Sequence, residues 1–222
     1  MPIDRENLKR TLIEMKRLYE EDPIKAVRSQ RMIKQLHDFS IRELKRLGIS
    51  EGKVIIKPEA KVFGAHKPKR VDVAVIHKEV GPLIIISIRS QMSSIDKNFI
   101  NYYEGIIGDV ISLHDKYPDL VIGEIYMLPK ETIINDAHGN RRIEPHNLRK
   151  KEELFKRITN RRDGKDRIDK YEHLAFLAVD FVKDPPEILN IPEDPTLRIE
   201  DFYDKLLKTY QERNPFLDIL EL

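Results

Sequence analysis

The segment RVDVAVIHKEVGPLIIISIRS (residues 70–90) decides how this chain folds. Two runs rich in β-branched residues, 71–76 and 83–89, flank the turn-forming sequence EVGP (79–82). Apolar runs on either side of such a turn predict a β-hairpin. The second run is almost entirely aliphatic, which is typical of a central strand covered on both faces of its sheet. We therefore expect two neighbouring strands within a sheet that has helices on both sides.

The sequence on either side of this hairpin supplies those helices. Residues 4–47 carry apolar side chains at helical spacing that is broken at Asp22-Pro23, which predicts two helices, with Pro23 in the first turn of the second. Gly48 is suited to cap the second helix. A short strand is expected at 54–56.

Helical spacing returns after the hairpin, over residues 94–117, and Tyr117-Pro118 ends it. The following segments are predicted as a buried strand at 121–128, a long loop or small hairpin at 130–146, and helices at about 147–159, 167–182 and 198–212. This order predicts an α/β fold, a mixed sheet flanked by helices. We expect a single domain over 1–222, composed of an N-terminal helical unit (1–49), an α/β core (50–130) and a C-terminal helical part with a basic loop and helix (131–222).

Composition excludes several kinds of site. The 222 residues include no cysteine, which excludes disulfide scaffolds, thiol nucleophiles and zinc–thiolate sites. The longest aliphatic run, 83–86, is far shorter than the roughly 20 residues that span a bilayer. Because the N-terminal sequence is also polar, we expect a cytoplasmic protein without a membrane segment. Abundant isoleucine and a charged fraction of 35% are typical of thermophile proteins.

Polar side chains stand near the ends of the two hairpin strands. Asp72 lies near the start of the first strand, and Ser87 and Arg89 lie at the end of the second. Strand alternation puts Ser87, Arg89 and Gln91 on one face, and hairpin pairing brings Asp72 towards them. Polar groups at the end of a rigid sheet predict a functional site.

At these residues the chain resembles the PD-(D/E)xK, or restriction-endonuclease-like, superfamily of nucleases, over roughly residues 53–129. In that family an Asp opens one strand and a Glu-x-Lys lies on the adjoining strand, whereas this chain has Asp72 and then Ser87-x-Arg89. In one subgroup of type II restriction enzymes the strand glutamate is replaced and a carboxylate comes from the following helix. Glu104 stands in the corresponding helix, at the border of its apolar stripe.

The resemblance implies a Mg²⁺-dependent endonuclease of the type II restriction class, with Mn²⁺ as a substitute, that cuts double-stranded DNA as a homodimer. A cognate DNA methyltransferase would belong to the same system without being a stable subunit. Asp72 and Glu104 would hold the metal, since Mg²⁺ prefers oxygen ligands, and Ser87 and Arg89 would complete the catalytic set. Arg89 can donate to a phosphate but cannot act as a base at working pH.

Charge is unevenly distributed along the chain. Residues 149–170 contain ten Lys/Arg against five Asp/Glu, although the whole chain has a net charge of only +2. Such a span predicts salt-sensitive contacts with DNA phosphates, or else a solvated helix with internal ion pairs. The candidate DNA-binding residues are Lys97, Asn101, Gln91, His138, Asn140, Arg141, Arg142, Arg149, Lys150, Lys151, Arg161, Arg162 and Lys165.

Two other functions fit the same residues. The substitutions at Ser87 and Arg89 fit a DNA-binding protein that has lost catalysis on the same fold. A structural or interaction protein is the third hypothesis, in which Asp72 and Arg89 form a salt bridge and the basic span is solvated.

Overall fold

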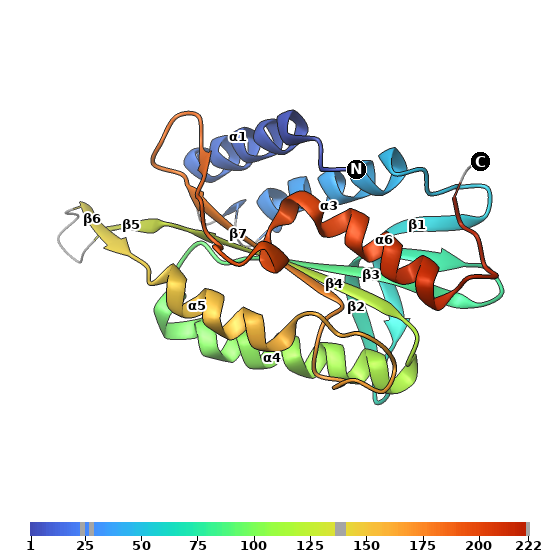
Figure 1. The fold of residues 1–222 in the computed structure, drawn as a ribbon. Helices are drawn as coiled ribbons and strands as arrows, with labels where there is room; N and C mark the ends of the chain where they lie inside the picture. Colours follow the sequence, from blue (N-terminus) through green and yellow to red (C-terminus); the bar gives the residue numbers. More distant parts are fainter. Residues whose placement is uncertain (23–24, 27–28, 136–140, 221–222) are drawn as a thin grey trace.

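The computed structural model describes residues 1–22, 25–26, 29–135 and 141–220, with the side chains of all of these except 133–135 and 141. Within this part of the chain the predicted α/β class is confirmed, because a six-stranded mixed sheet is flanked by helices (Figure 1). Its strands, in spatial order, are β1 (Val54–Phe63), β2 (Pro68–His77), β3 (Gly81–Ser90), β4 (Val121–Pro129), β7 (His173–Asp180) and β8 (Glu187–Ile188). Strands β3, β4 and β7 run parallel, and the other neighbours pair antiparallel.

Helices cover both faces of the sheet. On one face lie α1 (Arg5–Glu21), α3 (Arg31–Arg46) and α6 (Phe202–Arg213), and on the other lie α4 (Ile95–Lys116) and α5 (Leu148–Phe155) (Figure 1). Short 3-10 turns occur at Lys156–Ile158, Pro195–Leu197 and Ile199–Asp201. No helix in the described part of the chain is long and apolar enough to cross a membrane.

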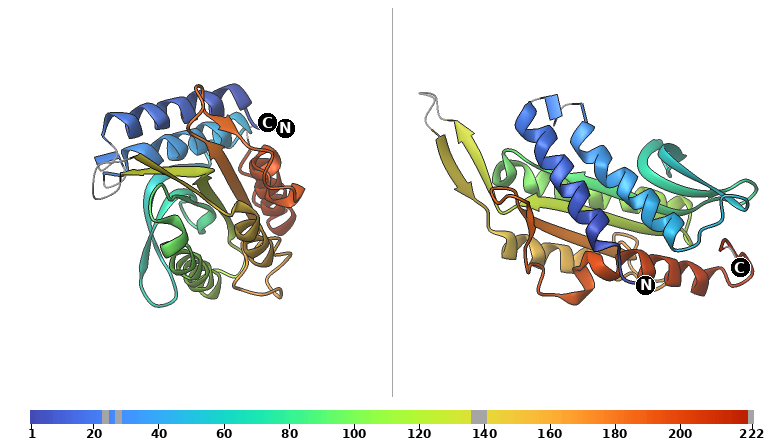
Figure 2. Two further views of the ribbon diagram at one scale, coloured as in Figure 1. Left: turned by 90° about the vertical axis from the view of Figure 1, so that its left-hand side faces the viewer. Right: turned by 90° about the horizontal axis from the view of Figure 1, so that it is seen from above.

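A two-stranded ribbon projects from this body. It consists of β5 (Glu131–Asn135) and β6 (Arg141–Pro145), which pair antiparallel and extend away from the sheet (Figures 1 and 2). The sequence predicted either a long loop or a small hairpin for residues 130–146, and the pairing of β5 with β6 supports the hairpin. Its base is held by buried His146, whose Nε2 lies 2.6 Å from Thr132 Oγ1 and whose Nδ1 lies 3.0 Å from Asp96 Oδ2.

The hairpin predicted from residues 70–90 is confirmed. Val73 pairs with Ile86 and His77 pairs with Gly81, with a register shift between Val75 and Ile76. Strand β3 lies between β2 and β4, as its aliphatic sequence predicts.

Three other predictions were wrong. The second helix, predicted as one helix from Pro23 onward, is interrupted at Ser29 and Gln30 and resumes as α3 at Arg31, although Lys25 and Ala26 are helical and Pro23 lies outside the described residues. Strand β1 is much longer than the strand expected at 54–56. The predicted helix at 167–182 contains β7 instead, whose sequence HLAFLAVD is buried at every position after the first. A strand buried on both faces has no alternating pattern, so its periodicity does not distinguish it from a buried helix.

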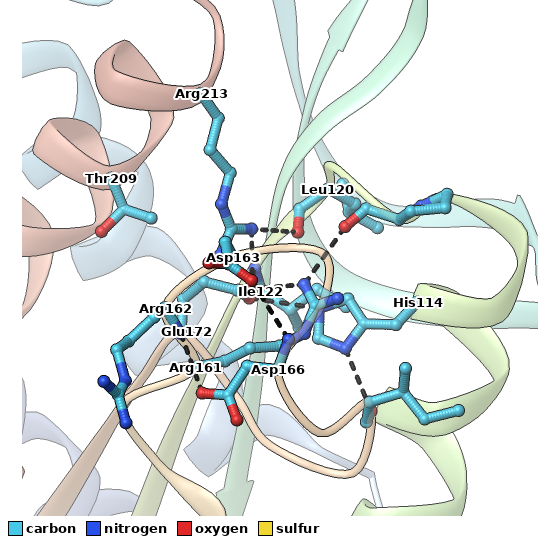
Figure 3. Close-up of polar contacts among 12 residues, drawn as sticks. His114, Leu120, Ile122, Arg161, Arg162, Asp163, Asp166, Glu172, Thr209 and Arg213 are labelled. Atoms are coloured by element: carbon cyan, nitrogen blue, oxygen red, sulfur yellow. Dashed lines mark hydrogen bonds and ion pairs between the residues drawn. The ribbon is translucent and has the colours of Figure 1, made fainter.

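A buried ion network ties the two helical layers to one end of the sheet (Figure 3). Glu172, just before β7, accepts hydrogen bonds from Arg161 Nη1 at 3.0 Å and Arg213 Nη1 at 2.7 Å. Its other oxygen accepts from the Ile122 N–H at 2.7 Å and lies 3.2 Å from His114 Nε2. Although burial alone raises the pKa of Glu172, these contacts outweigh it and lower the pKa to about 2.

The packing of α6 on β4 can be tested at two glycines. A Cβ at Gly123 would lie 2.6 Å from Phe202 Cζ and 2.8 Å from Leu206 Cδ1, whereas nothing lies within 4 Å of a Cβ at Gly105 in α4. We expect Gly123→Ala to lower the free energy of unfolding by about 1–3 kcal/mol. Gly105→Ala should raise it by up to about 1 kcal/mol, because alanine favours helix. Urea unfolding of both variants measures this, and equal stabilities would contradict the packing.

Candidate functional site

Strands β2 and β3 separate at Asp72. Their pairing ends at Val73 and Ile86, and beyond that point residues 68–71 pair with β1 while residues 87–90 pair with β4. The Asp72 Oδ2 atom accepts a hydrogen bond from the Ile88 N–H at 2.7 Å. A side-chain carboxylate thus replaces a backbone acceptor where the ladder stops. We call this point, between Asp72 and Ser87, the fork.

A cavity of about 630 Å³ opens at the fork. One wall comes from the start of α3, including Gln30, Ile33 and His37, and another comes from the end of β3, including Ser87 and Arg89. The third wall is the end of the β1–β2 hairpin that extends beyond the fork. The fork therefore exposes polar groups from several elements to one cavity.

Asp72 lies next to a buried histidine in the lining of this cavity. His37 Nε2 lies 3.4 Å from Asp72 Oδ1 and has no hydrogen-bond partner among the described residues. Burial lowers the pKa of His37, although the charge of Asp72 opposes the shift. Burial raises the pKa of Asp72 more than His37 and the Ile88 N–H lower it. Opposite Asp72 the backbone of Glu59 is left-handed, with φ of 46°, which is uncommon outside glycine.

A second group of charges surrounds Arg89. The Arg89 Nη2 atom donates to Asp109 Oδ2 at 2.9 Å, and Lys69 Nζ donates to Asp109 Oδ1 at 2.6 Å. On the other side, Arg89 Nε lies 3.9 Å from Glu124 Oε1. Arg89 therefore pairs with Asp109 and Glu124, and the described structure contains no Asp72–Arg89 salt bridge of the kind considered from the sequence.

Glu124 is the most perturbed carboxyl group of the site. It lies on β4 beside Ser87 of β3, is fully buried, and is not among the residues that line the cavity. Neither carboxyl oxygen accepts a hydrogen bond of normal geometry from the described residues, although the Tyr171 hydroxyl, which donates to the Ile106 carbonyl, is close enough to lower the pKa of Glu124. Burial raises its pKa to about 8, against the opposing charge of Arg89. At neutral pH Glu124 is therefore mostly protonated, and it becomes a charged oxygen ligand only when a nearby positive charge draws off the proton.

The structure places the predicted catalytic residues in two different locations. Asp72, Ser87 and Arg89 meet at the cavity, but Glu104 is exposed on α4 and does not line it. Asp109 of the same helix reaches Arg89 instead, because five residues turn a helix by about 140° beyond a full turn. Gln91 also lines the cavity, where its side chain bonds Tyr126 and the carbonyls of Ser94 and Ile95.

Three of the predicted DNA-binding residues are corrected by their burial. Arg161 is 3% exposed and belongs to the Glu172 network, Lys151 is 4% exposed and donates to Asp96, and Gln91 is 7% exposed with its side chain bonded within the protein. Arg149 is half exposed and pairs with Glu152 and Glu193. The other exposed candidates are Lys97, Asn101, Arg142, Lys150, Arg162 and Lys165. His138 and Asn140 lie outside the described residues, as does the side chain of Arg141.

Sequence reasoning missed Asp109, Lys69, His37 and Glu124. A signal existed for Glu124, because it is the single charge within the apolar run VIGEIYML (121–128), and an unpaired charge is rarely buried without a role. The other three are ordinary surface residues of helices or hairpin in the sequence, and they reach the site through tertiary packing.

Neither the comparisons with known proteins nor the grouping of metal-ligating side chains assigns a function to the site. Comparison of the chain with protein-family models, curated proteins and solved structures finds no match. Among the described residues, no three His, Asp or Glu side chains are grouped closely enough to hold a metal ion by themselves.

The raised pKa of Glu124 has a measurable effect on stability. A carboxyl group whose pKa rises from 4.5 in the unfolded chain to about 8 on folding holds its proton more tightly when folded. Its contribution to stability therefore falls as pH rises from about 4.5 to about 8. Glu124→Gln keeps the shape without titrating, so the variant should gain stability relative to the wild type across this window. Urea unfolding at pH 5, 6.5 and 8 measures the difference, and a difference independent of pH would contradict the raised pKa.

Proposed function

We propose that the fork is the active site of a Mg²⁺- or Mn²⁺-dependent endodeoxyribonuclease, resembling type II restriction enzymes. The observation that carries this proposal is the order of Asp72, Ser87 and Glu124 across the three adjacent strands β2, β3 and β4. Asp72 and Ser87 are the first residues beyond the last β2–β3 pair, so they flank the fork, and Ser87 pairs with Glu124 on β4. Because Ser87 is small, its side chain leaves space between the two carboxyl groups.

The residues of the fork suit a divalent cation. Mg²⁺ typically keeps several waters and takes one or two protein carboxylates together with substrate phosphate. Asp72 and Glu124 would be those carboxylates, and the two unpartnered oxygens of Glu124 favour this assignment over exposed Glu104. The ion would supply positive charge to the scissile phosphate and lower the pKa of a water molecule.

The basic side chains at the cavity would bind the phosphate itself. Arg89 offers the bidentate donors of a guanidinium, and Lys69 offers an ammonium, both now paired with Asp109. Because Arg89 keeps its proton, it would orient and neutralise phosphate oxygens rather than act as a base. Cutting both strands of a symmetric DNA site would take two copies of the chain, which agrees with a homodimer.

A second function is favoured by the position of Arg89. Its guanidinium lies between Asp109 and Glu124 and already places a positive charge beside Glu124, where a metal ion would otherwise bind. A protein with this arrangement would bind DNA without cleaving it.

Plasmid digestion with Mg²⁺ or Mn²⁺ separates these functions. The wild type should give discrete fragments, and Asp72→Asn or Glu124→Gln should slow cleavage by more than about 100-fold, because each removes a charged ligand while keeping its shape. Glu104→Gln, a matched change on the exposed surface of α4, should leave the rate unchanged.

The alternative outcomes are distinct. Cleavage that survives both Asp72→Asn and Glu124→Gln would refute the site. DNA binding without cleavage by the wild type would favour the second function, and no DNA binding at low salt would refute both.

A further inference from the structure

The end of the β1–β2 hairpin forms an arm, residues 59–72, beyond the fork. One side of the arm is buried through Ala60, Val62 and Val71, and its turn contacts α4, where the Ala65 N–H donates to the Ser112 carbonyl at 2.8 Å. Figure 1 shows this hairpin passing the edge of the sheet to reach the helix. On the other side of the arm, Lys61, Phe63 and Arg70 are exposed, and this is called its uncovered side.

That uncovered side is basic. Lys61 lies directly opposite Arg70, and both are exposed. Like charges at directly opposed positions of two strands repel each other, which destabilises the pair. The only counter-charge within ion-pair distance among the described residues is Glu59, whose Oε2 lies 3.7 Å from Arg70 Nη1. The repulsion between Lys61 and Arg70 would be relieved by an anionic partner.

An exposed aromatic ring extends the same side of the arm. Phe63, opposite Pro68, is 61% exposed and follows Lys61 at the two-residue spacing that keeps side chains on one face. In the opposite direction the same face leads from Arg70 to Asp72 at the fork. Cations interleaved with an exposed ring are the pattern that binds a nucleic-acid backbone together with its sugars and bases.

We propose that the uncovered side of the arm binds the DNA strand and guides it into the fork, with Lys61 and Arg70 on phosphates and Phe63 on a sugar or base. This inference deepens the proposed function and rests on it. It places the main DNA contact on residues 59–72 rather than on the basic span 149–170, for which the sequence left DNA contacts and a solvated helix both open.

Binding of a fluorescein-labelled 30-base-pair duplex, followed by anisotropy in EDTA over a range of salt concentrations, tests the proposal without cleavage. Each lost phosphate contact lowers the slope of log affinity against log salt by about 0.9, so Lys61→Ala with Arg70→Ala should lower it by about 2. Affinity at low salt should fall about tenfold. Phe63→Ala should weaken binding without changing the slope.

Two matched variants separate recognition from structure. Lys9→Ala with Arg10→Ala removes two exposed charges from α1, on the other helical layer, and should leave the slope unchanged. Lys61→Glu places opposite charges across the strands, so it should raise the Tm of the free protein while weakening DNA binding.

The outcomes distinguish this inference from the proposed function. If the wild type binds tightly and the double variant of Lys61 and Arg70 keeps the same salt slope, the DNA-binding role of the arm is refuted, while the proposed nuclease function is not. An equal loss in the α1 control would also refute that role, since the contacts would then be unspecific. A wild type that does not bind DNA at low salt would overturn both proposals.

Discussion

The hydrogen bond from the Ile88 N–H to the Asp72 carboxylate holds the structure of the site together. Two strands of a sheet can part only where the freed backbone groups find other partners. Asp72 provides that partner, and the separation of β2 from β3 follows from it. The cavity, the exposure of Ser87 and Arg89 to it, and the free course of the arm all depend on this separation. A residue that resembles a catalytic carboxylate thus also has a structural role.

Charge compensation determines what the fork can do. Arg89 and Lys69 share Asp109, while Glu124 remains protonated and without a hydrogen-bond partner among the described residues. The site therefore holds fewer negative charges at neutral pH than the carboxyl groups of Asp72, Asp109 and Glu124 suggest. A divalent cation would have to draw the proton from Glu124, and this couples binding to pH. If no cation replaces the proton of Glu124, the fork remains a cavity lined by Arg89 and Lys69, which would bind DNA without cleaving it.

The sequence predicted the part of the site that depends on local geometry. A turn at 79–82 and strand alternation suffice to bring Asp72 near Ser87 and Arg89. Asp109 and His37 could not be predicted, because their places depend on how α4 and α3 lie against the sheet. Counting charges along the chain also predicted DNA-binding residues wrongly, because Arg161 and Lys151 are buried and pair with carboxylates. β7 was mistaken for a helix because both of its faces are apolar.

Calorimetric titration of the protein with Mn²⁺ at pH 7, in buffers of different ionisation enthalpy, tests the central claim most directly. It counts protons released when the ion binds. If Asp72 and Glu124 hold the ion, about one proton should leave per Mn²⁺ bound, because Glu124 has a pKa of about 8. That release should vanish in Glu124→Gln and decline above pH 8. Binding without proton release, or release unchanged in Glu124→Gln, would contradict a cation site at the fork.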